Sequence, residues 1–340
     1  MDLSYAYANA RIKAMRSKLF NRDGMRELID VKTIAEFIEL LEESPYKQSF
    51  VAASTRFSGN ELIKKALDDD LAAAFRKVAH IVPPKARPLV SRLLQNWEVN
   101  NIKKIIALKA LGRSVSKQDL LLTNGSSLLA KLLDQKDLPS VLKTLSSSEY
   151  GAALQKPLAH FHRDGDYRVL LTALDEYYYQ QLSLLLKEEK DAMVKKFMEK
   201  KISVTNAVTA LRLRKSGVSA SKTREFLIDA PNQKFCGQMV GAKSLKEAIG
   251  IASAHLKEPI SDSVAEKAAA TGELSPIEEA FERQLLVQAR KTLSRSVLSP
   301  GVVVGYLYLK QEEVHALRMI SYASQFEVKQ DIKEMVLARL

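Results

Sequence analysis

The residues of this chain best suited to chemistry lie between positions 159 and 167, in the sequence AHFHRDGDY. His160 and His162, followed by Asp164 and Asp166, bring imidazole and carboxylate groups together, and a His-x-His pair can bind zinc or iron. No distant residues suggest themselves as the rest of a ligand set. Asp164-Gly165-Asp166 is also typical of an ordinary turn into a helix. We therefore interpret the segment as a turn and expect no metal site here.

Three further candidates for chemistry are equally weak. Asp68-Asp69-Asp70 could supply paired acids, but this run lies on a polar segment of a predicted helix. Gly241-Ala242-Lys243-Ser244 resembles a phosphate-binding loop but lacks the Gly that should directly precede the Lys. Cys236 has no His partner nearby in the sequence, which favours a buried small hydrophobe over a nucleophile. We predict no catalytic residue and no bound cofactor.

The elements that position these residues repeat along the chain. Asn9, Asn101 and Asn206 each stand in a helical run, in the sequences NARIKAMRSKL, NIKKIIALKALG and NAVTALRLRKSG. An acidic residue followed by two apolar ones begins 18, 18 and 19 residues later, at Glu27, Asp119 and Glu225. Three such spacings are hard to obtain by accident. The sequence therefore predicts three related units.

Two further helices complete each unit. The second reads IAEFIELLEESPY and LPSVLKTLSSSEY in the first two units, and its third counterpart, LKEAIGIASAHL, lacks the Tyr. The third opens with an apolar pair and then an acid, at Asp68, Asp175 and Glu282, and both intervals are 107 residues. The predicted units are residues 1–95 (repeat 1), 96–200 (repeat 2) and 201–340 (repeat 3 with closing helices).

The repeated polar residues are interpreted as structural. An amide side chain near a helix start can cap backbone donors, so Asn9, Asn101 and Asn206 are expected to be caps. The repeated acids are better explained by the fold, for instance by contacts between units. A final helix, expected from Glu312 to Gln330, matches only the opening of a fourth unit, with His315 where Asn is expected.

Apolar periodicity predicts an all-α fold. Pro and Gly residues end several of the predicted helices, and no convincing strand alternation occurs in the sequence. The region from Pro259 to Pro276 has weak periodicity and is the best linker candidate. The expected long helices are Tyr5 to Phe20, Asn60 to Val82, Leu89 to Leu111, Tyr167 to Lys200 and Pro276 to Leu298.

Composition is consistent with an ordered protein of two or three domains. The chain has 340 residues, of which 46% are hydrophobic, and only 13 are Gly and 10 Pro. One cysteine excludes an intrachain disulfide and suits a reducing compartment. The longest strongly apolar run, Val302 to Leu309, is shorter than the roughly 20 residues that cross a bilayer. Neither this run nor the N-terminus reads as an anchor or a signal peptide, so we expect a soluble or peripheral protein.

The formal net charge of +12 allows several interpretations. It could attract nucleic acid, anionic headgroups or an acidic protein surface, or it could only keep the protein soluble. The basic runs at Lys195-Lys196, Lys200-Lys201 and Arg212 to Lys215 are not interleaved with aromatic residues, as a base-stacking surface would require. We therefore expect no nucleic-acid partner.

Taken together, these segments resemble a known family. The ordered set is YAYANARIKAMRSKLF, the ELI and DLL runs, the helix ending in SPY, WEVNNIKKIIALK, and the closing LYLKQEEVHALRMI. It is similar to the C subunit of archaeal and bacterial A/V-type rotary ATPases, whose eukaryotic vacuolar counterpart is the d subunit, and it covers nearly the whole chain. The resemblance implies a funnel-shaped, all-helical protein of three similar domains around a pseudo-threefold axis.

The resemblance also implies a role. Proteins of this kind lie on the cytoplasmic face of the membrane, peripheral to it, and join the proteolipid rotor ring to the central shaft made by the D and F subunits. They couple ATP turnover on other subunits to proton or sodium transport and are not themselves catalysts. Composition alone equally permits a free-standing helical-repeat scaffold that binds protein or RNA.

Overall fold

The computed structural model describes residues 3–121, 126–229, 234–324 and 335–336. These residues form helices and connecting turns, and none of them lies in a β-strand. The predicted all-α fold is therefore confirmed. The chain divides into two compact units: unit 1 comprises Met1–Leu182 with Lys310–Ala338, and unit 2 comprises Ser183–Leu309. The division into three repeats remains a prediction.

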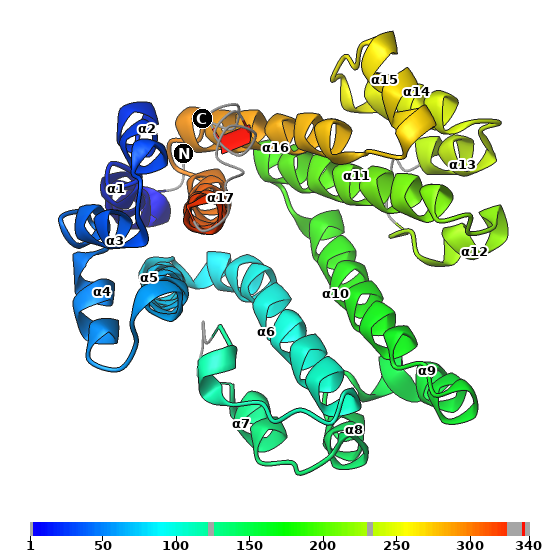
Figure 1. Ribbon diagram of the computed structural model, residues 1–340, viewed down its shortest axis with the longest axis horizontal. Coiled ribbons are helices and arrows are strands. Elements are labelled where there is room, and N and C mark those ends of the chain that lie inside the picture. The colour runs from blue at the N-terminus through cyan, green and yellow to red at the C-terminus, as the bar shows by residue number, and fades with distance from the viewer. Residues whose placement is uncertain (1–2, 122–125, 230–233, 325–334, 337–340) are drawn as a thin grey trace. The chain divides into compact units, whose positions relative to one another are not determined.

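Unit 1 is a succession of short helices joined to longer ones, drawn from blue to green in Figure 1. Its core is lined by aromatic side chains, among which Phe37, Tyr46, Phe50 and Tyr150 are fully buried. The elements are η1 (Leu3–Tyr5), α1 (Ala6–Arg16), α2 (Arg22–Asp30), α3 (Ile34–Glu42), α4 (Lys47–Ser54), α5 (Gly59–Ile81), η2 (Pro84–Ala86), α6 (Arg87–Ala110), η3 (Lys117–Asp119), α7 (Ser127–Leu133), α8 (Leu138–Ser146), α9 (Gly151–Asp164) and most of α10 (Arg168–Glu188).

Unit 2 is built around two long helices, α11 and α16, which lie side by side in Figure 1 and pack on each other. Shorter helices cover them, and α14 contacts both. The first part of α17 belongs to this unit and its last part, from Lys310, belongs to unit 1. The elements are α11 (Ala192–Lys215), α12 (Ala220–Glu225), α13 (Lys234–Gly241), α14 (Leu245–Leu256), α15 (Asp262–Thr271), α16 (Ser275–Arg295) and α17 (Gly301–Ala323).

The helix boundaries follow from side chains that satisfy the first backbone N–H groups. Thr33 accepts from the Glu36 N–H at 3.2 Å, while the Glu36 carboxylate accepts from the Lys32 N–H and not from Thr33 itself. Pro83 and Gly112 follow α5 and α6, close to the ends expected at Val82 and Leu111, and Gly112 has a φ of +68°. Between Gly112 and α8, the residues that the structure describes form two short helices, η3 and α7.

Three expectations about helix boundaries are wrong. The final helix, expected from Glu312, already begins at Gly301 as α17, and its expected end at Gln330 lies outside the described residues. The segment from Tyr167 to Lys200 is not one helix: α10 ends at Glu188, and Asp191 starts α11 by accepting 2.9 Å hydrogen bonds from the N–H groups of Met193 and Val194. Because α11 continues to Lys215, Asn206 lies in its interior. The expected linker from Pro259 to Pro276 contains α15, which Ser261 caps by accepting from Val264.

Candidate functional site

A group of polar side chains in unit 1 surrounds Tyr46, which lies between α3 and α4. The Tyr46 hydroxyl donates to a Glu313 carboxylate oxygen at 2.8 Å and accepts from the Lys310 ammonium at 2.8 Å. The ammonium also lies 4.0 Å from the centre of the Tyr46 ring and 2.8 Å from an Asp70 carboxylate oxygen. Tyr46, Lys310 and Glu313 are buried, so this cluster fastens α17 to repeat 1.

An equivalent cluster surrounds Tyr150 of repeat 2. The Tyr150 hydroxyl donates to Glu98 at 2.8 Å and accepts from the Gln95 amide at 3.3 Å, so both partners lie on α6. Glu149, the residue before this Tyr, accepts from Gln95 and from the Tyr177 hydroxyl at 2.9 Å. The neutral Gln95 therefore stands where the Tyr46 cluster has Lys310.

Two of the repeated acids make equivalent ion pairs. Asp175 on α10 lies 2.5 Å from the Lys103 ammonium on α6, and Asp68 on α5 pairs with the Arg318 guanidinium on α17. The Asp68 side chain is the more buried of the two. In the first pair both members belong to repeat 2, whereas in the second the chain's last helix supplies the cation.

These contacts give a common register for α6 and α17. Gln95 corresponds to Lys310, Glu98 to Glu313 and Lys103 to Arg318, and the residue numbers differ by the same amount in all three pairs. The end of α17 thus makes the contacts in repeat 1 that α6 makes in repeat 2. The register places Ala316, and not His315, opposite Asn101, which corrects the alignment expected from the sequence.

The expected capping role of the asparagines is wrong. Asn101 is buried in the middle of α6, where its amide donates to the Leu121 carbonyl at 2.8 Å and its oxygen accepts from the Leu121 N–H at 3.1 Å. Asn206 makes the same pair of bonds with the backbone of Ile228, at 3.0 and 2.8 Å. Each amide therefore pairs with one backbone N–H and one backbone carbonyl of the segment that follows the helix. Without the amide, these two groups would lack this partner.

The other members of the repeat signature lie on corresponding helices. Asn9 is buried on the short helix α1, and Glu282 is partly exposed on α16. Repeat 3 departs from the tyrosine pattern. Ser203 stands at the position of Glu98, and its hydroxyl lies 3.4 Å from the His255 Nε2 atom. The Lys200 ammonium, in the place of Gln95, donates to the Leu256 carbonyl at 2.7 Å.

Burial shapes the electrostatics of these contacts. Loss of solvent raises the pKa of Glu313, against the opposing effects of Lys310 and the Tyr46 hydroxyl. It raises the pKa of Asp68 as well, although Arg318 acts in the opposite direction. Burial, together with the Glu98 carboxylate, also raises the pKa of Tyr150. These groups form hydrogen bonds and ion pairs that join neighbouring helices.

The residues first considered for chemistry fall into ordinary structural roles. His160 and His162 lie on α9, and Asp166 accepts from the Arg168 N–H at the start of α10. Ser244 caps α14 by accepting from Glu247. Cys236 is buried, and burial raises the pKa of its thiol to about 11. Among the described residues, no group of three or more His, Cys, Asp or Glu side chains is arranged to hold a metal ion.

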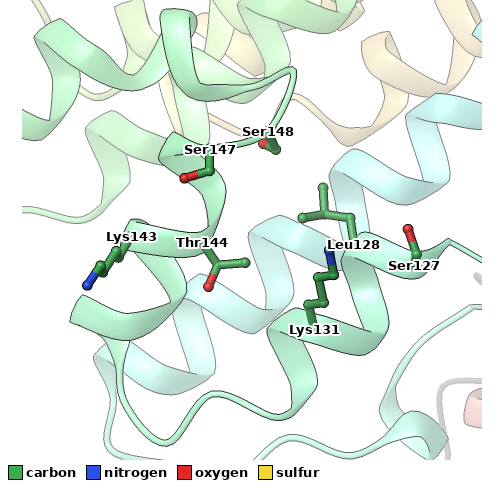
Figure 2. A pocket seen from close by; sticks show the side chains of 7 residues that line it. All are labelled: Ser127, Leu128, Lys131, Lys143, Thr144, Ser147 and Ser148. Carbon is green, nitrogen blue, oxygen red and sulfur yellow. The ribbon is translucent and has the colours of Figure 1, made fainter.

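An open cleft of about 470 Å³ lies between α7 and α8 (Figure 2). The Thr144 hydroxyl donates to the Ser140 carbonyl and the Ser148 hydroxyl to the Leu145 carbonyl. In Figure 2 the Lys143 side chain points away from Lys131, so the cations do not converge on one point. We assign no ligand to this cleft. Its lining residues are Ser127, Leu128, Lys131, Lys143, Thr144, Ser147 and Ser148.

The contacts between helices are distributed along nearly the whole chain, and so is its likeness to known proteins. The family model described as "ATP synthase (C/AC39) subunit" matches residues 8–335. The chain belongs to this family. The resemblance drawn from the sequence is thereby confirmed, and the described part of the chain has no helix that combines the length and apolar character needed to cross a membrane.

Curated relatives in this ATP synthase family match at low identity over almost their full lengths. The C subunit of the A-type ATP synthase of Thermococcus onnurineus is 27% identical, with 98% of this chain and 90% of the relative covered. The Haloquadratum walsbyi protein of the same name is 28% identical, with 96% and 97% covered. That of Methanocaldococcus jannaschii is 24% identical, with 94% and 83% covered.

Sequence reasoning missed Lys310, Glu313 and Arg318 as members of the repeat pattern. The only signal for them was the similarity of QEEVHALRMI to NWEVNNIKKI. In both segments a Glu precedes a Val, and a cation lies four residues after this Val. An alignment on the Glu-Val pair, in place of the Asn, would have given the register that the contacts show.

Proposed function

We propose that this chain is the non-catalytic central-stalk component of an A/V-type rotary ATP synthase or ATPase. In this role it joins the central shaft of the D and F subunits to the membrane proteolipid ring and couples ATP turnover on other subunits to proton or sodium transport. It lies on the cytoplasmic face of the cell membrane as a peripheral protein. The family match over residues 8–335 carries this proposal.

The internal contacts are suited to a part that transmits torque. A coupling protein must resist shear between its helices, and this favours many packed contacts over one small pocket. The Tyr46 cluster and the Asp68–Arg318 pair tie the last helix to repeat 1, hundreds of residues away in the sequence. Charge-assisted hydrogen bonds in a buried setting are directional, so they oppose sliding as well as separation.

The proposed architecture is three similar domains around a pseudo-threefold axis, corresponding to residues 1–95, 96–200 and 201–340. Two observations support it. The tyrosine cluster and the acid–cation pair recur in repeats 1 and 2. The asparagine bonds to a following backbone recur in repeats 2 and 3.

An affinity pull-down of the tagged full chain from detergent-solubilised native membranes tests this function. Mass spectrometry should identify the proteolipid together with the D and F subunits. Recovery of RNA or of a soluble protein, with no part of the ATPase even at low salt, would replace the proposal with the free-standing scaffold.

A further inference from the structure

Unit 2 carries a cluster of cations where α11, α16 and the end of α14 meet. The Lys200 ammonium on α11 donates to the Leu256 carbonyl at the end of α14 and lies 3.3 Å from the Gln284 oxygen on α16. Lys257 directly follows Leu256, so its backbone is held beside Lys200. The ammonium of Lys200 therefore marks the junction of the three elements.

Helix geometry places two further lysines at the same junction. Lys196 precedes Lys200 by one turn of α11, and Lys291 follows Gln284 by two turns of α16, so each lies on the face that meets the junction. The electrostatics agree with this placement, because burial lowers the pKa of Lys200 and, against the opposing charge of Glu258, the charges of Lys196, Lys257 and Lys291 lower it further. We call Lys196, Lys200, Lys257 and Lys291 the lysine cluster.

Glu258, whose charge acts on Lys200, is itself paired within the protein. Glu258 is buried, lies 2.5 Å from the Arg283 guanidinium and accepts from the Gln284 amide. Lys196, Lys257 and Lys291 are exposed. The outward-facing charge of this junction is consequently positive, and it matches the excess of cations in the whole chain, +12 at pH 7.

The backbone at Lys257 has an uncommon conformation for a residue other than glycine. Lys257 has a φ of +54°, and it is the one non-glycine residue with positive φ in the described part of the chain. It ends α14 in the left-handed conformation that usually belongs to glycine at this position. This conformation sets the path of the chain directly after the Leu256 carbonyl that accepts from Lys200.

The composition of the cluster decides what kind of partner it fits. Lysine is depleted and arginine enriched at protein–protein interfaces. The lysine ammonium is a compact, strongly hydrated charge on a flexible stem, and it lacks the fixed fork with which arginine recognises one carboxylate. A surface of exposed lysines is therefore better matched to many mobile phosphates than to a fixed set of carboxylates.

We propose that the lysine cluster binds the anionic phosphate headgroups of a membrane surface. The attraction is electrostatic and reversible, weakens with salt, and requires no inserted helix. This inference goes beyond the proposed coupling function and does not depend on it, because it concerns the isolated chain and lipid alone.

The test is co-sedimentation of the purified full chain with vesicles of phosphatidylcholine alone or mixed with phosphatidylglycerol. The variant Lys196→Gln/Lys257→Gln/Lys291→Gln removes the three exposed charges and leaves Lys200 and its hydrogen bonds in place. Its matched control, Lys131→Gln/Lys136→Gln/Lys143→Gln, removes three exposed lysines around α7 and α8. Circular dichroism melts of both variants verify that each is folded.

We expect the wild-type chain to bind only the anionic vesicles. Each lysine near such a surface contributes about fivefold, so the cluster variant should bind about a hundredfold more weakly, while the control variant changes binding by less than about tenfold. Equal losses in the two variants would mean that net charge alone attracts the chain, and absence of wild-type binding would also overturn the proposal. If the cluster variant kept vesicle binding but lost an acidic protein from a membrane pull-down, a protein surface would replace the lipid.

Discussion

The Tyr46 hydroxyl donates a 2.8 Å hydrogen bond to the Glu313 carboxylate across 267 residues of sequence. Tyr150 makes the equivalent bond to Glu98 across only 52 residues, within a single repeat. The comparison shows that repeat 1 takes from the far end of the chain a helix segment that repeat 2 supplies for itself. The stability of repeat 1 therefore depends on contacts that can form only after the last helix has been made.

Removing the Tyr46 hydroxyl should weaken this connection. Tyr46→Phe keeps the buried ring but leaves the Glu313 carboxylate and the Lys310 ammonium each without one hydrogen-bond partner. A hydrogen bond to a charged group contributes about 1.5–3 kcal/mol, so we expect the free energy of unfolding to fall by that amount in urea titrations. Tyr150→Phe is the matched control and should cost less, because Gln95 and Glu98 are less buried. Equal losses would contradict the difference in burial.

The pH dependence of stability should report on Glu313. Burial raises its pKa above the ordinary value of 4.5, and the Asp70 charge acts in the same direction. The Lys310 charge and the hydrogen bonds donated by the Tyr46 hydroxyl and the Phe20 N–H lower the pKa but do not outweigh burial. The folded state thus holds this proton more tightly than the unfolded chain does. The contribution of Glu313 to stability is accordingly greatest at low pH and falls as the pH rises from 4.5 through the raised pKa.

Glu313→Gln isolates this contribution, because it removes the titrating group and keeps a side-chain oxygen that can accept from Tyr46. The difference in unfolding free energy, wild type minus variant, should decrease as the pH rises through that window in chemical denaturation series. A difference that stays constant or increases with pH would show that burial does not raise this pKa.

Asn101 should contribute more than a helix cap does. Asn101→Ala removes two buried hydrogen bonds and leaves the Leu121 N–H and carbonyl without them. We expect a loss of about 2–3 kcal/mol, compared with about 1 kcal/mol for a typical cap. Asn100→Ala, at the exposed neighbouring position, should change stability by less than about 0.5 kcal/mol. Amide hydrogen exchange at Leu121 should accelerate only in the first variant.

The two acid–cation pairs should differ in strength. Asp68 is more buried than Asp175, so Asp68→Asn should cost more than Asp175→Asn because it leaves the Arg318 guanidinium partly buried and without this carboxylate. A double-mutant cycle on Lys103 and Asp175 should give a coupling energy of about 0.5–1 kcal/mol, as is usual for half-exposed pairs. The cycle on Asp68 and Arg318 should exceed it, and a smaller value would contradict the expected effect of burial.

The helices could be predicted from the sequence, whereas the contacts between them could not. Apolar periodicity and the breaks at Pro83 and Gly112 locate α5 and α6, because these signals act within a few residues. The break before α11 went unseen since Asp191 caps the helix with no Pro or Gly nearby. The partners of Tyr46 lie on a helix whose match to α6 is faint, and no local rule connects them. The asparagines were assigned the wrong role because an amide can serve a distant backbone as well as its own helix.

The packing of α17 on α16 should depend on the absence of a side chain at Gly305. A Cβ atom there would lie 2.7 Å from the Leu293 Cβ atom and 2.8 Å from the Ala289 carbonyl oxygen, distances that the backbone of α16 cannot relieve without moving. We expect Gly305→Ala to destabilise the protein by about 1–3 kcal/mol in thermal melts, as overpacking of a close contact usually does. Gly250→Ala, inside α14 with no atom within 4 Å of the added methyl group, should instead stabilise by up to about 1 kcal/mol through helix propensity. Since the substitution is the same at both sites, stabilisation by both variants would mean that α16 and α17 are not in close contact at Gly305.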